Sequence, residues 1–413
     1  MSDPRNVLAF VGENRNGILA VQSARFMELL RPYGYTGHVI DLCGDDVAQR
    51  LSGLLIEGVA FAWGYAGIGS TMGQSGGGRG GASQGGRNLW EAFKVPFVSV
   101  LADPPFWIPR NHHVGSGWVV NGYVYRDWLE FQRRFVRSPQ VSGLVRMGVL
   151  ANPARDAIPW EARPVGMAYI KTGSDPEARR ARWTEWPAPV RDALEDAASA
   201  ALHQGTGDMV DIAIGAFDAA GLHLEARPEM LFGLLYELDL YLRAERATRI
   251  ARALLPLEVE IHGDGWEHLE AEGARASFRP AFHAGKLDDV FARCRWLVNA
   301  TPNFSSGAHE RVLRGFAAGC AVVSDENDYS RERLAGMAAF RGIDWGMGCT
   351  SAALTEQLAA ALADRSIGPD TLAEATRFVE DAFNPADFMQ SVIDLADTAR
   401  LRESFDAFSP VAA

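Results

Sequence analysis

Residues 299–325 read NATPNFSSGAHERVLRGFAAGCAVVSD, and they alternate between the patterns of buried strands and of an amphipathic helix. The apolar run 296–300 predicts one strand, and residues 321–324 predict a second. Between the two strands, apolar side chains recur at helical spacing over residues 312–317, and Gly319 is placed to end that helix. The stretch therefore predicts a strand–loop–helix–strand unit of an α/β domain.

The loop before this helix is polar and contains Ser305 and Ser306, which we expect to cap the helix. A helix that begins at such a loop presents free N–H groups and the positive end of its dipole, and both favour a bound phosphate. An ordinary helix of an α/β core would show the same pattern. The stretch alone leaves both interpretations open.

The composition is that of a globular protein with room for two domains. The chain has 413 residues, of which 47% are hydrophobic and 22% charged. The net charge of −12 argues against a general nucleic-acid binder, because no Lys/Arg excess is present to neutralise a phosphate backbone. The four cysteines form no C-x-x-C pair, which favours reduced thiols over disulfides or a zinc site.

The first residues show no signal-peptide pattern, and the chain has no apolar run of about eighteen residues. We therefore expect a cytoplasmic protein.

The N-terminal part of the chain alternates strand and helix patterns. Strands are predicted at residues 6–11, 37–42, 58–65, 96–101, 119–124 and 143–150. This alternation predicts an α/β sheet of parallel strands, which bind ligands at their carboxyl ends. The loop after the first strand lacks the G-x-G-x-x-G pattern, so a nicotinamide dinucleotide is poorly supported.

Residues 67–86 hold the densest glycine content of the chain. Such a segment favours a mobile surface loop over a preformed phosphate cradle. A long loop at the end of a strand is also where a lid or an acceptor-binding loop would lie.

Three residues of the N-terminal part are candidates for proton transfer. Asp103 directly follows the strand at 96–101, where a catalytic carboxylate would emerge, although Asp before Pro is also ordinary turn chemistry. His113 lies nearby, but a loop histidine without a visible partner has no role by default. Glu13, in the loop after the first strand, is the third candidate.

The α/β pattern restarts after a proline-rich linker at residues 151–164. A strand at 165–170 is followed by a short polar loop that begins with Lys171 and Thr172. A largely helical stretch then runs from about 177 to 255. Its arginines recur every three residues, and we expect a solvated helix face rather than a binding patch. They are Arg243, Arg246, Arg249 and Arg252.

Two motifs of the C-terminal part resemble those of GT-B glycosyltransferases, and more narrowly those of the bacterial CgeB-like (spore-maturation-type) and group 1 enzymes. The motifs are H-G-D-G-W at 262–266 and S-S-G-x-H-E-R-V-L-x-x-x-A-A-G-C-A-V-V-S-D at 305–325. The run N-L-W-E-x-x-x-V-P-F-V-S-x-L-x-D-P-P-F at 88–106 is also similar to this group. The resemblance is most specific over residues 257–330.

The resemblance implies an α/β fold of two Rossmann-like domains facing a cleft. Residues 1–160 would hold the acceptor, joined by a C-terminal helix at about 385–408 that crosses back. Residues 161–384 would hold a nucleotide-sugar donor and carry a helical insertion at about 177–255. The acceptor would be a hydroxyl of a glycan, a lipid-linked group or a protein, with peripheral membrane contact left open. No cofactor is implied beyond the donor substrate, and the oligomeric state is not predicted.

The donor-contacting residues implied by the resemblance follow C-terminal strands or begin the helix at 312–317. They are Lys171, Thr172, His262, Gly263, Trp266, Ser305, Ser306, Gly307, His309, Glu310 and Arg311. A helix N-terminus with Arg or Lys can stabilise a leaving diphosphate without a metal, and the chain contains no Asp-x-Asp pair. We therefore expect a metal-independent donor site. The acceptor hydroxyl needs a general base, for which Asp103 is the first candidate, with Glu13 and His113 behind it.

One feature of many retaining members is absent. Their two glutamates, eight positions apart, would fall at Ser306 and Arg314. This difference favours inversion of the sugar configuration. Two alternatives remain open, namely a sugar-nucleotide epimerase of the same architecture and a non-catalytic protein that binds a nucleotide-sugar or glycan.

Overall fold

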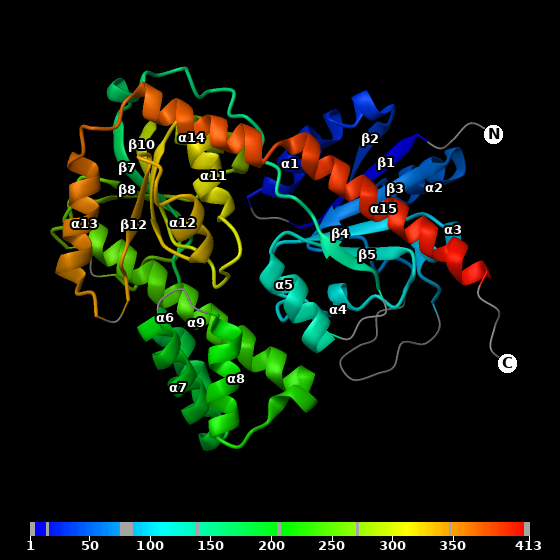
Figure 1. The fold of residues 1–413 in the computed structure, drawn as a ribbon, viewed down its shortest axis with the longest axis horizontal. Coiled ribbons are helices and arrows are strands. Elements are labelled where there is room, and N and C mark those ends of the chain that lie inside the picture. The colour runs from blue at the N-terminus through cyan, green and yellow to red at the C-terminus, as the bar shows by residue number, and fades with distance from the viewer. Residues whose placement is uncertain are drawn as a thin grey trace. The chain divides into compact units, whose positions relative to one another are not determined.

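The computed structural model describes residues 5–13, 16–74, 86–136, 140–204, 208–269, 272–346 and 348–408, the last six of these by their backbone only. The chain divides into two compact units (Figure 1). The N-terminal unit consists of Met1–Gly148 together with Phe383–Ala413, and the C-terminal unit is Val149–Ala382. Each unit is built on one six-stranded sheet in which all neighbouring strands are parallel, so the predicted α/β class is confirmed.

The sheet of the N-terminal unit has the strand order β2-β1-β3-β4-β5-β6. Its strands are β1 (Asn6–Val11), β2 (Thr36–Asp41), β3 (Val59–Tyr65), β4 (Phe97–Leu101), β5 (Val119–Tyr123) and β6 (Ser142–Leu144). The helices between them are α1 (Ile18–Glu28), α2 (Val47–Glu57), α3 (Leu89–Phe93), α4 (Pro109–His112) and α5 (Arg126–Phe131), which continues as a π-helical turn over Gln132–Val136. The carboxyl ends of these strands lie along one edge of the sheet, because all of them are parallel.

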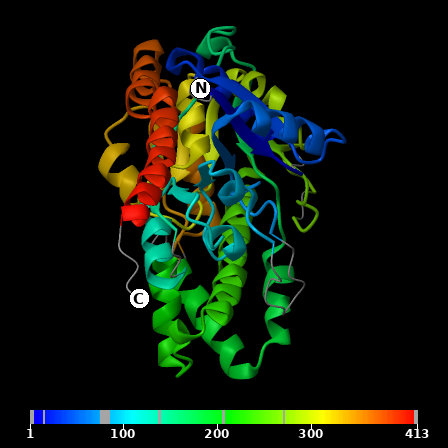
Figure 2. The same ribbon diagram turned by 90° about the vertical axis from the view of Figure 1, so that its right-hand side faces the viewer.

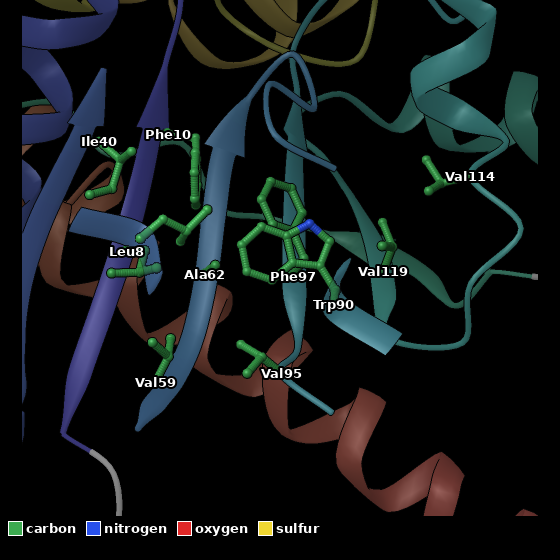
Figure 3. Packing of buried hydrophobic residues seen from close by; sticks show 11 residues of the cluster. Leu8, Phe10, Ile40, Val59, Ala62, Trp90, Val95, Phe97, Val114 and Val119 are labelled. Carbon is green, nitrogen blue, oxygen red and sulfur yellow. The ribbon is translucent and has the colours of Figure 1, made fainter. Parts of the chain in front are cut away.

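One face of this sheet carries a closely packed aromatic and aliphatic core (Figure 3). Phe10, Trp90 and Phe97 form its centre, with the rings of Trp90 and Phe97 4.9 Å apart. The loop after β3 folds back onto this face, and a side chain on Gly64 would lie 2.3 Å from the carbonyl oxygen of Ile68. Glycine in the strand therefore lets the loop close over the core.

Helix α15 (Pro385–Phe408) packs on the opposite face of the sheet, against β3, β4 and β5 (Figures 1 and 3). Its Phe388 is buried, with ring centroids 4.5 Å from Phe26, 5.8 Å from Trp63 and 6.2 Å from Tyr65. The last helix of the chain thus completes the core of the N-terminal unit.

The sheet of the C-terminal unit has the strand order β12-β11-β10-β7-β8-β9. Its strands are β7 (Val165–Ile170), β8 (Glu260–His262), β9 (Ser277–Arg279), β10 (Cys294–Asn299), β11 (Ala321–Asp325) and β12 (Phe340–Ile343). Helices α10 (Leu287–Ala292), α11 (Glu310–Ala317), α12 (Asp328–Arg333), α13 (Ser351–Ala363) and α14 (Pro369–Ala382) connect or cover these strands.

Between β7 and β8 the chain forms α6 (Pro176–Ala181), α7 (Ala188–Gln204), α8 (Met209–Ala219) and α9 (Pro228–Leu254). In Figures 1 and 2 these helices, drawn in green, extend away from the sheet of their unit. The single helix α9 spans 27 residues, runs the length of this insertion and returns to the sheet. Within the described part of the chain, no helix combines the length and hydropathy that a membrane span requires.

The structure differs from the predicted elements mainly in the strands. The strand expected at 143–150 is the short β6. Strands β9 and β12 were not predicted, because three or four residues with exposed or mixed faces give no clear period.

Replacing Phe388 by Ala should lower the free energy of unfolding by about 3–5 kcal/mol, because a buried aromatic ring in contact with three others is lost. The matched control is Leu401→Ala on the same helix, since Leu401 is 58% exposed and should change stability by less than about 0.5 kcal/mol. Urea unfolding of both variants measures the difference. Equal effects of the two changes would contradict the docking of α15.

Candidate functional site

The loops after β7 and β8 are in direct backbone contact at the carboxyl edge of the C-terminal sheet. The N–H of Lys171 donates to the carbonyl of His262 over 2.9 Å, and Gly173 N–H donates to Asp264 over 2.8 Å. A Cβ on Gly263 would lie 2.2 Å from the Lys171 carbonyl oxygen, and Gly263 has a φ of +133°. Glycine at this position therefore lets the two loops extend the sheet beyond its strands.

Two of the residues predicted to contact the nucleotide-sugar have side chains that are hydrogen-bonded within the protein. His262 Nε2 lies 2.9 Å from Glu260 Oε2, and the Trp266 indole N–H donates to the carbonyl of Lys171 over 3.1 Å. Both side chains are mostly buried, and Thr172 after β7 is exposed. His262 and Trp266 thus shape the wall around Lys171.

Helix α11 begins at His309 rather than at the serines of the preceding loop. His309 is the N-cap residue and makes no side-chain capping hydrogen bond. The prediction that Ser305 and Ser306 cap this helix is wrong, because the N-cap position is His309. The Ser305 hydroxyl donates instead to Asp328 at the start of α12. The N-cap side chain of α11 therefore does not cap the helix.

The rest of this loop is fixed by α12. The side-chain amide of Asn327 donates to the carbonyls of Phe304, over 3.2 Å, and of Gly307, over 2.9 Å. Ser306 is exposed, and Glu310 forms an ion pair of 2.8 Å with Arg314 on the outer part of α11. The loop is thereby held beside the N-terminal end of α11.

Asn299, at the end of β10, orients the two side chains that follow the loop. Its Oδ1 accepts from Arg311 Nη1 over 3.1 Å and lies 2.8 Å from His309 Nδ1. Its Nδ2 donates to Ser324 Oγ over 2.9 Å. The amide is buried, so the side chains of His309 and Arg311 are both positioned by a buried group at the end of β10.

Four cationic side chains gather at this edge, from the loop after β7 and from α9 and α11. They are Lys171, Arg243, Arg246 and Arg311. The Lys171 ammonium makes no hydrogen bond or ion pair with any described residue, and Arg311 has one hydrogen bond, to Asn299. The carboxylates of Asp239 and Asp325 enter the same cluster, and Glu310, which also acts on Arg311, is balanced by its ion pair with Arg314. The cluster therefore carries an excess of positive charge.

Arg246 lies within the protein, which corrects the expectation of a solvated arginine face on this helix. The residue is 2% exposed, and its guanidinium lies 3.2 Å from Asp325 Oδ2. It donates to the carbonyl of Thr301 and, over 2.9 Å, to Asn303 Oδ1, and it stacks 4.3 Å from the centre of the Trp345 ring. Arg246 thus joins α9 to the loops that follow β10 and β11.

Arg243, one turn earlier, forms an ion pair of 2.7 Å with the fully buried Asp239. Asp239 also accepts from Asn303 Nδ2 over 2.8 Å. Arg252 is exposed. Residues spaced by three turn about 60° around a helix at each step, so Arg252 lies on the side opposite Arg243. This geometry was the available signal that the four arginines do not share one face.

Tyr169 adds a buried hydroxyl to the site. It lies on β7, is fully buried, and its Oη has no hydrogen-bond partner in the described structure. Burial raises the pKa of Tyr169, with Arg311 acting in the opposite direction. The phenol is therefore neutral. Like Arg246, Tyr169 is a candidate site residue that the sequence analysis did not identify.

The pKa of Lys171 is strongly perturbed. Burial, followed by the charges of Arg311, Arg243 and Arg246, lowers the pKa of its ammonium to about 7, while Asp239 acts in the opposite direction. Burial also lowers the pKa of Arg311, with Tyr169 and Glu310 acting in the opposite direction and Arg314 in the same one. The positive charges at this site therefore destabilise the folded protein, and a bound anion would offset this destabilisation.

The three proton-transfer candidates lie in the N-terminal unit at the carboxyl edge of its sheet. Asp103 follows β4, Glu13 follows β1, and His113 ends α4, and all three are exposed. The neighbouring His112 is different, since its Nδ1 lies 2.7 Å from the Tyr123 hydroxyl and burial lowers its pKa to about 3. His112 is therefore a neutral core residue. Most of the predicted glycine-rich loop, residues 75–85, lies outside the described residues.

Among the described residues, no group of three or more His, Cys, Asp or Glu side chains is arranged to hold a metal ion. No family model matches the chain, and no curated protein sequence matches it.

The chain is similar in structure to several glycosyltransferases. AviGT4, a glycosyltransferase involved in avilamycin A biosynthesis, matches with a TM-score of 0.52 and 12% identity, over 97% of this chain and 99% of its own. The chain has a GT-B fold. HepE of Anabaena in complex with UDP-glucose matches at a TM-score of 0.48 and 10% identity, over 96% and 99% of the two chains. Sucrose-phosphate synthase of Thermosynechococcus elongatus matches at 0.49 and 10%, over 98% and 100%.

The narrower likeness to CgeB-like enzymes stays a prediction.

Replacing Arg246 by Met should lower the free energy of unfolding by about 3–5 kcal/mol, because Asp325 would be left buried and without its counter-ion. The control is Arg252→Met on the same helix, which should change stability by less than about 0.5 kcal/mol. Adding Asp325→Asn to Arg246→Met should recover part of the loss. Calorimetric or urea unfolding measures the stability of all three variants. If Arg246→Met left the free energy of unfolding unchanged, the buried ion pair would not contribute to stability.

Lys171→Met should make the unliganded protein more stable near neutral pH. In the unfolded chain the lysine has its ordinary pKa of 10.5, so between about pH 7 and 10.5 the unfolded state binds more protons and the stability of the native protein rises with pH. Below about pH 7 the cost of the buried charge is fully present. Removing that charge should therefore stabilise the protein at pH 7 by roughly 1–3 kcal/mol, and the gain should shrink towards pH 10.

Unfolding curves of Lys171→Met at pH 6 to 10 test this expectation against Lys286→Met, an exposed lysine of the same unit. A Lys171→Met variant that is less stable than the native protein at pH 7 would show that the charge of Lys171 does not destabilise the folded protein.

Proposed function

We propose that this protein is a metal-independent glycosyltransferase. It would move a sugar, such as a hexose, from a nucleotide-sugar donor to a hydroxyl group of a glycan, lipid-linked or protein acceptor. The observation that carries the proposal is the cationic cluster of the C-terminal unit, which lies beside the N-terminal end of α11. The GT-B fold supports the same assignment, although a fold alone does not fix an activity.

The charge of the cluster suits a diphosphate. Four cationic side chains lie with two carboxylates, which leaves an excess of two positive charges when Lys171 is protonated. Arg246 and Arg243 are already paired, so Lys171 and Arg311 are the groups with donors to spare. These two side chains and the N–H groups of the first α11 turn are the proposed diphosphate ligands.

The same groups would assist the chemical step. In the transfer, the bond between the anomeric carbon and the diphosphate oxygen breaks, and its electron pair remains on the nucleoside diphosphate. A bond forms between the acceptor oxygen and the anomeric carbon, and the acceptor proton passes to a base. Negative charge on the leaving group increases as the bond breaks, so fixed positive charge at Lys171 and Arg311 would lower the barrier.

The N-terminal unit supplies the proposed general base. Asp103 is our first candidate, because it is an exposed carboxylate directly after a central strand. Glu13 and His113 are the alternatives at the same sheet edge. We favour inversion, since the positions of the retaining glutamate pair hold the exposed Ser306 and Arg314, whose guanidinium is engaged by Glu310.

Binding is tested by calorimetry with a panel of UDP-, GDP-, ADP-, TDP- and CMP-sugars. The native protein should bind at least one of them, and Arg311→Gln should weaken that binding by about 10- to 100-fold, because a charged hydrogen bond contributes about 1.5–3 kcal/mol. Arg331→Gln, an exposed arginine of α12, is the control and should bind normally. Failure of the native protein to bind any member of the panel would refute the proposal.

Turnover separates catalysis from binding. Asp103→Asn should reduce turnover by about 100- to 10,000-fold and leave donor affinity unchanged, as expected for loss of a general base. Asp45→Asn, an exposed carboxylate that follows β2 of the same sheet, should leave turnover intact. Product analysis without an acceptor distinguishes an epimerase, which would release an epimerised sugar and free nucleoside diphosphate. Unchanged turnover in Asp103→Asn would reject Asp103 as the base.

A further inference from the structure

The hydrogen bonds of Asn299 determine which nitrogen of His309 carries its proton. A guanidinium can only donate, so the Asn299 atom that faces Arg311 Nη1 at 3.1 Å is an oxygen. The other end of the amide donates to Ser324 Oγ over 2.9 Å and to Thr301 Oγ1 over 3.2 Å, which agrees with this orientation. The flipped amide would place an NH₂ group against the Arg311 donor.

The same oxygen lies 2.8 Å from His309 Nδ1, so Nδ1 must be the protonated nitrogen. In the neutral ring, Nε2 then carries the lone pair. This nitrogen makes no hydrogen bond with a described residue, and it is accessible to solvent. His309 therefore presents an acceptor at the start of α11.

The surroundings of His309 keep the ring neutral. Burial is the main cause that holds the pKa of His309 well below its ordinary value, and the charges of Arg311, Lys171 and Arg243 act in the same direction. A lone pair among cations is unsuited to an anionic oxygen, since two acceptors would face each other. It is suited to a group that donates a hydrogen bond and carries no charge.

We propose that His309 recognises a hydroxyl group of the donor through Nε2 and does not contact the phosphates. The inference rests on the proposed glycosyltransferase function, and it divides the donor site into two parts. Lys171 and Arg311 supply positive charge for the diphosphate, and His309 accepts a hydrogen bond from the ribose or from the transferred sugar. Asn299 is a positioning residue, because it fixes the tautomer without facing the ligand.

The free protein tests the tautomer directly. Nitrogen NMR of the ¹⁵N-histidine-labelled chain should show that the His309 ring remains neutral and protonated at Nδ1 from pH 6 to 8. The signal is assigned by its loss in His309→Asn. Protonation at Nε2, or a charged ring in this pH range, would overturn the inference whatever the protein binds.

Two substitutions separate the two nitrogens. In His309→Asn the side-chain amide can still donate to Asn299 but does not reach the position of Nε2, whereas in His309→Gln an oxygen can approach that position. For the intact nucleotide-sugar that the native protein binds, His309→Asn should weaken affinity by about three- to tenfold and His309→Gln should restore most of it. The affinity for inorganic pyrophosphate should be the same in all three proteins.

Analogues identify the hydroxyl. If the group is on the ribose, the dideoxyribonucleoside diphosphate should bind the native protein more weakly by the same factor, and His309→Asn should not distinguish the two nucleotides. If it is on the sugar, the loss in His309→Asn should appear only with the intact nucleotide-sugar. Equal losses for pyrophosphate and nucleotide would make His309 a phosphate ligand and overturn the inference. Failure of the native protein to bind pyrophosphate, nucleotide and nucleotide-sugar alike would instead refute the proposed function.

Discussion

The buried ion pair of Arg246 and Asp325 is the interaction on which the C-terminal unit depends. It joins the long helix α9 to the ends of β10 and β11, and neither side chain is more than 2% exposed. Such a pair is costly to bury and more costly to break, because either partner alone would be an uncompensated charge. Its hydrogen bonds to Thr301 and Asn303 therefore set the position of the loop that leads to α11.

This constraint explains how an acidic protein builds a cationic site. The chain has a net charge of −12, yet Lys171, Arg243 and Arg311 approach one another from the loop after β7 and from α9 and α11. Each element is held by neutral contacts or internal ion pairs, so the repulsion among the cations is tolerated in the folded state. The arrangement lowers the pKa of Lys171, and the buried hydroxyl of Tyr169 has no hydrogen-bond partner in the described structure. Both fit a site whose electrostatic balance is completed by an anionic ligand.

The sequence predicted the fold well because its strongest signals are local. The short apolar runs of β1, β7 and β10 and the helical period of α11 depend on neighbours a few residues away. The predicted capping of α11 by Ser305 and Ser306 failed because the N-cap position is His309, and the Ser305 hydroxyl is instead engaged by Asp328, 23 residues later in the chain. The arginines of α9 were assigned to solvent for a similar reason, since spacing alone does not tell which side of a helix will be covered.

The sequence by itself determined the two α/β units, their parallel strands and the candidate status of Lys171, His309 and Arg311. Only the tertiary structure decided which charges meet, because Arg246 and Asp325 are 79 positions apart and nothing local marks them as partners. It also decided the protonation of His309, which follows from a single amide oxygen shared with Arg311. The spacing of apolar residues along the sequence indicates which face of a helix or strand is buried. The direction of a hydrogen bond and the protonation state of a side chain depend on groups that folding brings together.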